Sequence, residues 1–428
     1  MGWRQIKAGP LFSYSLTCIC PLDVSTYMSF GELAVMEINL AIKFFHRLII
    51  MMDMKSCLIF FWIMLPCTLM ADELKNKLVN QDGTYDVAPL EKEVITLKVI
   101  QTGVNSLQEY DDPKVGLKEN LNHMIEMADL ACNEGSEPDI LLYHEFPLTG
   151  YSSGPRAEKL KYTIEVPGPE TEALGKVAKE CDAYLIFGSY ATDKEWPEHI
   201  LSLNTVIGRD GEIKKVYWKP RNIKRLYPDR EITTTTIEAV QEKYREKYGI
   251  EEEFPVLKTE FGNIAVSTVQ GDPFVFAAFA MKGVEIMLRT ATLFSESDVL
   301  AMAWINNFYS AMSNITIPLG TPYSENGGKS LIASPQGKII AQDPSTHEEG
   351  IVSAEIPIAE FRKNRTIPNY ALEMVQEIFS QYQQEIPMNH LDMPTDQLPK
   401  TGEEMKDLFD EISRYLNKPD MSEPVSRN

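Results

Sequence analysis

Cysteine is scarce in this chain, which has six cysteines in 428 residues. Four of them precede residue 72, and only Cys132 and Cys181 follow it. Two cysteines are too few for a disulfide scaffold, and no Cys/His spacing suggests a zinc site. The pair His144-Glu145 does not begin an HExxH motif, because Leu148 stands where the second histidine would be. We therefore expect no metal site and no cofactor.

Basic residues are also few. The chain has 41 Lys and Arg against 62 Asp and Glu, which gives a formal net charge of −21. Such a chain is repelled by phosphate backbones and by anionic lipid, so nucleic acid is not an expected partner. Hydrophobic residues make up 44% and charged residues 24%, which are ordinary globular values and exclude wholesale disorder. The length allows two or three domains, or one large α/β domain with tails.

The N-terminal apolar run is too short to span a membrane. It covers residues 58–65, whereas a spanning helix needs about 20 apolar residues. Lys55 precedes the run, and Ala71 stands just before the acidic Asp72, which is the pattern of a secretory signal peptide. We expect a signal peptide at 54–71 and an exported protein, periplasmic or secreted, without membrane contact after cleavage. The alternative is an uncleaved N-terminal membrane anchor.

Residues 1–53 do not fit this arrangement, because a signal peptide starts at the initiator methionine. Met51, Met52 and Met54 are all plausible starts. We therefore expect residues 1–53 to be an over-extended or unstructured N-terminus, and residues 72–92 to be a linker.

From residue 93 to 365 the pattern alternates between strands and helices. Strands are predicted at 94–100, 139–143, 183–188, 264–266 and 284–288, with hairpins at 203–217 and 330–341. Helices are predicted after Asp112, around 174–181 and at 274–283. Alternating strands and helices combined with hairpins predict a mixed-sheet α/β domain with helices covering the sheets.

The remainder, 366–428, reads as a helical tail. One helix is predicted near Tyr370 and another at Thr401, where Glu404 completes a capping box. The second helix has an apolar face, formed by Met405, Leu408, Phe409, Ile412 and Tyr415. This face either packs on its own domain or clasps a partner subunit.

Three segments could carry chemistry. Glu145 follows a buried strand, where a carboxylate can act as a general base, although a lone Glu of this kind is more often a structural ion-pair partner. Lys219 ends a hairpin strand and is, taken alone, more often a solvated lysine. Residues 263–273 form a strand, a tight turn and a helix start, with Asp272 as the N-cap and Pro273 at the first helical position. Nucleophiles often lie at such elbows.

In this order the segments resemble the nitrilase superfamily of carbon–nitrogen hydrolases, nearest its aliphatic amidase branch. The resemblance covers residues 94–365 and is carried by further matches at 280–289, 300–307 and 328–337. It implies a four-layer α-β-β-α sandwich and assembly into a homo-oligomer through helices. It also implies a small-molecule amide or nitrile-like ligand.

The family uses a glutamate base, a lysine and a cysteine nucleophile. The resemblance assigns Glu145 to the base, Lys219 to the lysine that stabilises the transition state, and Glu231 to an additional glutamate. It also places Thr268 and Arg289 among the residues that bind the ligand. The cysteine is missing, because its position falls on Ser267.

The surroundings of the nucleophile position depart from the family as well. Val269 stands in place of the usual aspartate, Phe274 in place of a glutamate, and alanine where an arginine is usual. Cys132 and Cys181 lie on predicted helix faces, where we expect free, buried thiols rather than substitute nucleophiles.

Replacing a thiol by a hydroxyl has a large expected cost. A cysteine pKa of about 8.5 can be lowered toward neutrality by a nearby lysine, whereas a serine hydroxyl resembles water, with a pKa near ~15. Allowing for the greater intrinsic nucleophilicity of an alkoxide, the handicap is on the order of 10³–10⁴ in rate. Three functions stay open. The protein could be a slow hydrolase of a small non-peptide amide or related C–N bond, a catalytically silent domain that binds a small ligand or a partner, or a structural subunit of an assembly.

Overall fold

The computed structural model describes residues 78–80, 82–152, 156–222, 234–321 and 324–381, together with Glu404 and Asp407. By its internal contacts the chain divides into Met1–Lys77 and Leu78–Asn428, and every described residue belongs to the second unit. The predicted N-terminal extension and signal peptide therefore lie outside the described residues. So does nearly all of the helix predicted from Thr401.

The first sheet contains the order β13-β1-β2-β4-β5-β6, and the short β3 pairs with β4. Strands β1, β2 and β4 run parallel, whereas β13, β5 and β6 join by antiparallel pairing. The strands are β1 Ile95–Gln101, β2 Ile140–Leu142, β3 Ile164–Glu165, β4 Tyr184–Asp193, β5 Trp196–Ile207, β6 Ile213–Trp218 and β13 Gly350–Ile356.

The second sheet has the order β12-β11-β10-β9-β8-β7, with β8, β9 and β10 parallel. Its strands are β7 Leu257–Thr259, β8 Gly262–Ser267, β9 Ile286–Ala291, β10 Tyr309–Asn314, β11 Leu331–Ala333 and β12 Ile339–Gln342. Neither β10 in this sheet nor β13 in the first sheet was predicted from the sequence pattern.

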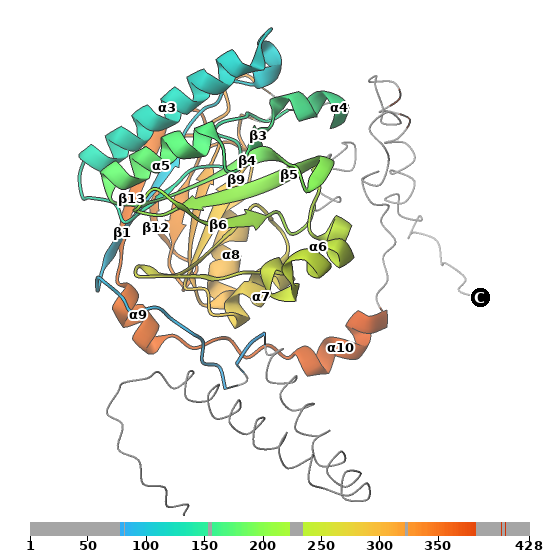
Figure 1. The fold of residues 1–428 in the computed structure, drawn as a ribbon. Helices are drawn as coiled ribbons and strands as arrows, with labels where there is room; N and C mark the ends of the chain where they lie inside the picture. The colour runs from blue at the N-terminus through green and yellow to red at the C-terminus, as the bar shows by residue number, and fades with distance from the viewer. Residues whose placement is uncertain are drawn as a thin grey trace, which may run out of the picture. The chain divides into compact units, whose positions relative to one another are not determined.

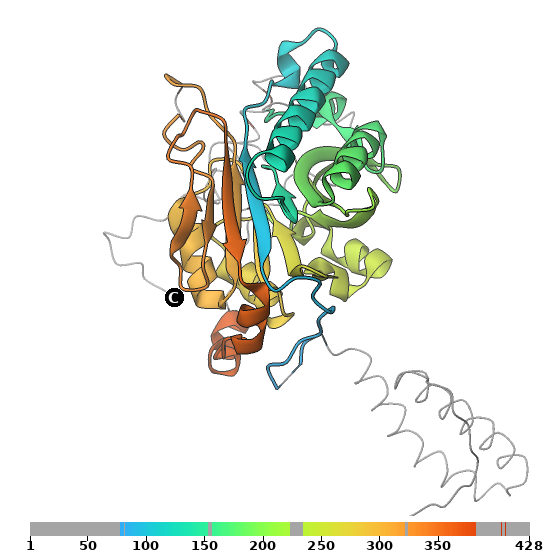
Figure 2. The same cartoon turned by 90° about the vertical axis from the view of Figure 1, so that its left-hand side faces the viewer.

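Helices cover the outer face of each sheet (Figures 1 and 2). Helices α3 (Pro113–Asn133) and α5 (Pro169–Cys181) share a core with outward side chains of the first sheet, such as Leu185 and Phe187. Helices α7 (Pro273–Met281) and α8 (Glu296–Asn306) pack in the same way on the second sheet. The inner faces of the two sheets meet in one apolar core, so the predicted four-layer α-β-β-α sandwich is confirmed.

The remaining helices lie outside these layers. They are α4 Arg156–Lys159, α6 Gln241–Tyr248, α9 Ile358–Asn364 and α10 Leu372–Gln381, with 3-10 turns η1 Leu107–Glu109, η2 Leu160–Tyr162, η4 Glu238–Val240 and η5 Ile250–Glu253. Helix α10 begins close to Tyr370, where the first helix of the tail was predicted. None of the helices in the described part of the chain combines the length and apolar character needed to cross a membrane.

Hydrogen bonds between the sheets align the strand ends. Ser313 Oγ, near the end of β10, donates to the Ile100 carbonyl near the end of β1 (2.7 Å). Thr290 Oγ1 of β9 donates to Asn204 Oδ1 of β5 (2.6 Å). The carboxyl ends of β1 and β10 therefore lie at one edge of the sandwich. Because β2 and β6 run with β1, and β8 with β10, residues that follow these three strands gather at that edge.

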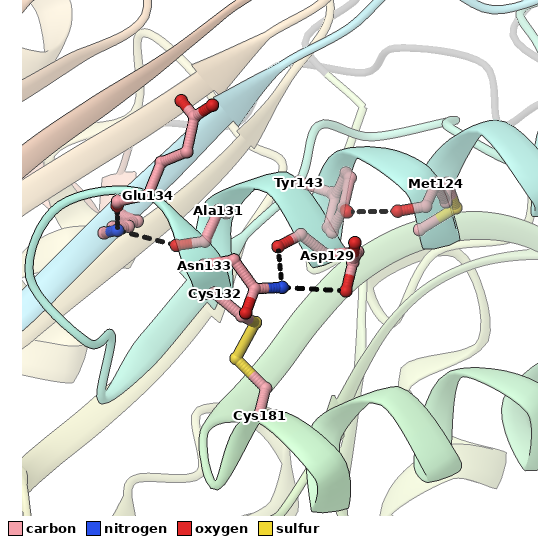
Figure 3. The surroundings of a disulfide bond; sticks show 9 residues. Met124, Asp129, Ala131, Cys132, Asn133, Glu134, Tyr143 and Cys181 are labelled. Atoms are coloured by element: carbon pink, nitrogen blue, oxygen red, sulfur yellow. Dashed lines mark hydrogen bonds between the residues drawn. A yellow bond between two sulfur atoms is a disulfide. The ribbon is translucent and has the colours of Figure 1, made fainter.

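Cys132 and Cys181 form a disulfide, which corrects the expectation that both are free thiols (Figure 3). Their Cα atoms are 5.7 Å apart, within the range that a disulfide requires. Cys132 lies in the last turn of α3 and Cys181 is the last residue of α5. The pairing arises because the two helices lie on the same sheet face with these ends together, a tertiary relation that helical periodicity does not reveal.

A buried lysine holds the same end of α3. Lys98 of β1 donates from Nζ to the carbonyl oxygens of Ala131 and Glu134, each at 2.6 Å. These are terminal carbonyls that the helix itself leaves without partners, and a cation there is favourable. Burial lowers the pKa of Lys98. The end of α3 is thus attached both to the sheet and to α5.

We predict that reducing the disulfide destabilises the protein. The bond joins residues separated by 49 positions, and closing a loop of that size stabilises a folded chain by about 2–4 kcal/mol. Urea unfolding with and without dithiothreitol should show this loss in the free energy of unfolding. The double variant Cys132→Ser/Cys181→Ser is the control and should not respond to the reductant. An unchanged midpoint for the parent protein in dithiothreitol would contradict the assignment.

Candidate functional site

Glu145 lies just beyond β2, in a turn that packs against the neighbouring strand. The Gly188 N–H of β4 donates to the His144 carbonyl (3.1 Å). A Cβ at position 188 would lie 2.3 Å from the Glu145 carbonyl oxygen, so only glycine permits this close approach. Glu145 is 4% exposed. The backbone thus holds the Glu145 carboxylate inside the protein, at the edge of the sandwich where the carboxyl ends of β1 and β10 lie.

Lys219 comes from the end of β6 and meets this carboxylate. Its N–H continues the sheet by donating to the Ser202 carbonyl (2.9 Å), and its Nζ donates to Glu145 Oε1 (3.1 Å). The two residues are 74 positions apart in sequence, and the fold brings their charged groups together. A charge removed from water needs such a partner, and each residue supplies it for the other.

Ser267 is the last residue of β8 and is fully buried. Its Oγ accepts a hydrogen bond from the Val269 N–H (3.3 Å). Within the described ranges, no histidine, lysine or carboxylate is hydrogen-bonded to this hydroxyl. Because β8 ends at the edge of the sandwich where Glu145 and Lys219 lie, Ser267 is at that edge too. That the Ser267 hydroxyl approaches the ion pair directly stays a prediction.

An ion pair ties the Lys219 segment to the Ser267 segment. Arg221 Nη1 lies 2.9 Å from Asp272 Oδ2. Asp272 also caps helix α7 as predicted, because its Oδ1 accepts from the N–H groups of Phe274 (3.1 Å) and Val275 (3.3 Å). The sequence pattern identified Asp272 only as a cap, and no spacing signalled Arg221. This pair draws the turn after β6 toward the elbow after β8.

Arg289 holds the elbow from the other side. Its Nη2 donates to the Val269 carbonyl and to Asp298 Oδ2, both at 2.6 Å, and its guanidinium lies 4.1 Å from the Phe276 ring centroid. Asp298 Oδ1 in turn accepts from the Gly271 N–H (2.8 Å). Burial lowers the pKa of Arg289. The observed contacts are with the protein itself, and the predicted role of Arg289 in ligand binding stays a prediction.

The other predicted binding residues are less defined. Thr268 is buried, and its Oγ1 has no hydrogen-bond partner among the described residues. Glu231 lies outside the described residues. No group of three or more His, Cys, Asp or Glu in the described part of the chain could hold a metal ion.

His144 adds a neutral group that sequence reasoning missed. Burial lowers its pKa to about 3, so the imidazole is uncharged at neutral pH. One ring nitrogen bonds to Thr102 Oγ1 (3.0 Å) and the other accepts from the Phe146 N–H (3.3 Å). The ring thereby fixes the backbone on both sides of Glu145. Its position beside the predicted base was the only signal in the sequence.

Comparison with known proteins identifies the family of this chain. The family model described as carbon-nitrogen hydrolase matches residues 106–366. The omega-amidase NIT2 of Xenopus tropicalis is 26% identical over 260 residues, which cover 57% of this chain and 86% of that protein. This chain therefore belongs to the carbon–nitrogen hydrolase family.

Solved structures of an amidase from Nesterenkonia sp. AN1 are also similar. A double mutant in complex with acrylamide is 16% identical, with a TM-score of 0.46, and covers 68% of this chain and 100% of its own. A mutant in complex with butyramide is 16% identical, with a TM-score of 0.46, and covers 66% of this chain and 96% of its own.

We predict that Glu145 and Lys219 are energetically coupled. A double-mutant cycle with Glu145→Gln and Lys219→Met should give a coupling energy of about 1–3 kcal/mol in urea unfolding, because the loss of Lys219 leaves the buried Glu145 charge unpaired. The matched control is the more exposed pair Lys215–Glu252, where Lys215→Met and Glu252→Gln should couple by less than about 1 kcal/mol. Equal coupling energies in the two cycles would contradict the account.

Proposed function

We propose that this protein binds a small carboxamide, or a related compound with a C–N bond to a carbonyl carbon, and hydrolyses it slowly through Ser267. The observation that carries the proposal is the ion pair of the buried Glu145 with the half-buried Lys219, 3.1 Å apart, at the sandwich edge where β8 ends in Ser267. Membership of a hydrolase family supports it, and so does the likeness to an omega-amidase.

The proposed reaction uses the three side chains in separate roles. Ser267 Oγ attacks the carbonyl carbon while Glu145 takes the hydroxyl proton, and the Lys219 ammonium stabilises the oxyanion that forms. Glu145 then returns the proton to the departing nitrogen, so that an amine or ammonia leaves and an acyl ester remains on Ser267. Water then attacks the ester carbonyl while Glu145 takes one of its protons, and Glu145 returns that proton to Ser267 Oγ as the ester C–O bond breaks and the acid leaves.

The reaction is expected to be slow because Ser267 is weakly activated. Its Oγ accepts from the Val269 N–H, which orients the hydroxyl without taking its proton. A carboxylate is a weak base toward a hydroxyl, and an active serine normally has a histidine or lysine beside it. The expected rate handicap relative to a cysteine is on the order of 10³–10⁴.

A catalytically silent, ligand-binding domain is the second candidate. It is favoured by the same observation: no basic side chain of the described residues is hydrogen-bonded to Ser267 Oγ. In that case the site would still bind an amide through Lys219 and Glu145 but form no ester. The two functions differ in one product, the acyl adduct on Ser267.

Export and self-assembly complete the proposal. The disulfide between Cys132 and Cys181 supports an exported protein, because disulfides persist mainly in oxidising compartments. Helix α10 exposes Met374 (77%) and Ile378 (67%), and apolar groups of this size support a contact with a second copy.

We predict an acyl adduct on Ser267. The purified protein is incubated with a panel of short amides and nitriles, and its intact mass is measured after an acid quench. The hydrolase function predicts a mass increase of one acyl group, mapped by peptide analysis to Ser267, because deacylation by the same weak base is slow. Ser267→Ala is the control and should gain nothing. A panel that leaves the parent mass unchanged while still raising its melting temperature would favour the silent domain.

We predict that Ser267→Cys creates a reactive thiol. Lys219 should lower the thiol pKa, so iodoacetamide should label position 267 rapidly at neutral pH. The variant should also gain amide hydrolysis of up to ~10³-fold if the nucleophile is the whole deficit. Cys132 and Cys181 are bonded to each other and do not compete for the reagent.

The control for this variant is Ser267→Cys/Lys219→Met, which should label more slowly. Equal labelling rates in the two proteins would show that Lys219 is not beside position 267. The proposed site would then be wrong at its centre.

A further inference from the structure

Strand β5 presents two different faces. Val206 lies in the core between the sheets, and Asn204 bonds to Thr290 of the second sheet. Leu203 and Ile207 lie instead in the core beneath α3 and α5. Because side chains alternate along a strand, Ser202 shares the inner face with Asn204 and Val206.

The two inner polar side chains have unused hydrogen-bond donors. Ser202 is 1% exposed and Asn204 is fully buried. Ser202 Oγ and Asn204 Nδ2 have no hydrogen-bond partner among the described residues. Asn204 Oδ1 accepts from Thr290 Oγ1, which leaves the amide nitrogen as the group without a partner. Buried donors of this kind are rare and costly, so each calls for an explanation.

Both donors lie on the strand that pairs with the Lys219 segment. The Ser202 carbonyl accepts from the Lys219 N–H (2.9 Å), so the two residues are opposed across β5 and β6. Opposed residues project to the same face of a sheet, and Lys219 reaches Glu145 from there. Asn204 is the next inner residue along β5, opposite Tyr217. The strand therefore carries a short row of donors that begins opposite Lys219 and continues along the inner face of the sheet.

We propose that Ser202 and Asn204 bind a second oxygen of the ligand, which makes the preferred ligand a short amide bearing a hydroxyl or keto group. This inference rests on the proposed function, because it assumes that the amide carbonyl lies at Lys219. A plain alkyl chain beside these residues would bury both donors without acceptors. A site built to hydrogen-bond a substrate group discriminates strongly against the analogue that lacks it.

The test compares propionamide with two isomeric amides that each carry one more oxygen. Propionamide, 2-hydroxypropionamide and 3-hydroxypropionamide are titrated by calorimetry against the parent protein and four variants. At least one hydroxylated amide should bind the parent protein about 10-fold more tightly than propionamide, the gain of one hydrogen-bonded group. That advantage should fall below about 3-fold in Ser202→Ala and in Asn204→Asp, which keeps the acceptor for Thr290 but loses the donor.

The matched controls are Ser189→Ala and Thr205→Val. Both remove a buried hydroxyl that has no partner among the described residues, as at Ser202. Ser189 is paired with Leu203, and Thr205 follows Asn204, so both lie on the outer face. These variants should keep the full advantage of the hydroxylated amide. Ser202→Ala should also keep the melting temperature of the parent protein, because a structural role would lower it.

Two outcomes would overturn the inference and leave the proposed function standing. In the first, propionamide binds as tightly as both hydroxylated amides. In the second, the advantage persists in both Ser202→Ala and Asn204→Asp. If none of the three amides binds and Ser267→Cys is not labelled, the proposed function fails, and this inference fails with it.

Discussion

The ion pair between the buried Glu145 and the half-buried Lys219 is the interaction on which the proposed site depends. It joins a turn after β2 to the end of β6, and it does so inside the protein, at 4% exposure for Glu145. Neither charge could be buried there alone at an acceptable free energy. The pair keeps a carboxylate and an ammonium group adjacent at the edge of the sandwich where the proposed site lies.

Other charged residues hold the turn between β8 and α7. The ion pair of Arg221 and Asp272 connects the turn after Lys219 to the start of α7. Arg289 donates to the Val269 carbonyl, and Asp298 accepts from the Gly271 N–H. In a chain with a formal net charge of −21, three basic residues, Lys219, Arg221 and Arg289, therefore lie at or next to the proposed site. These contacts fix the backbone on both sides of the turn after Ser267.

Much of this arrangement could be predicted from the sequence, for identifiable reasons. The β-branched run of β1 and the Asp272 cap are local features, and the structure contains both. Glu145 and Lys219 could be paired because several motifs occurred in the order of one family. Strand β13 was missed although Val352, Ala354 and Ile356 alternate, a signal that could have found it.

Other features depend on tertiary contacts and left no local signal. Strand β10 is mostly small and polar, and it is buried only because it lies between β9 and β11. The disulfide required knowing that the ends of α3 and α5 meet (Figure 3). The donors of Ser202 and Asn204 could be identified only once both faces of β5 were known.

The central claim is that the two sheets contribute to one site. The most direct measurement is a crystal structure of the protein soaked with acetamide. The account predicts the amide oxygen within hydrogen-bond distance of Lys219 Nζ and the carbonyl carbon about 3–3.5 Å from Ser267 Oγ, the separation of a reactive encounter. Acetamide bound at Lys219 with Ser267 Oγ turned away beneath helix α7 would contradict it.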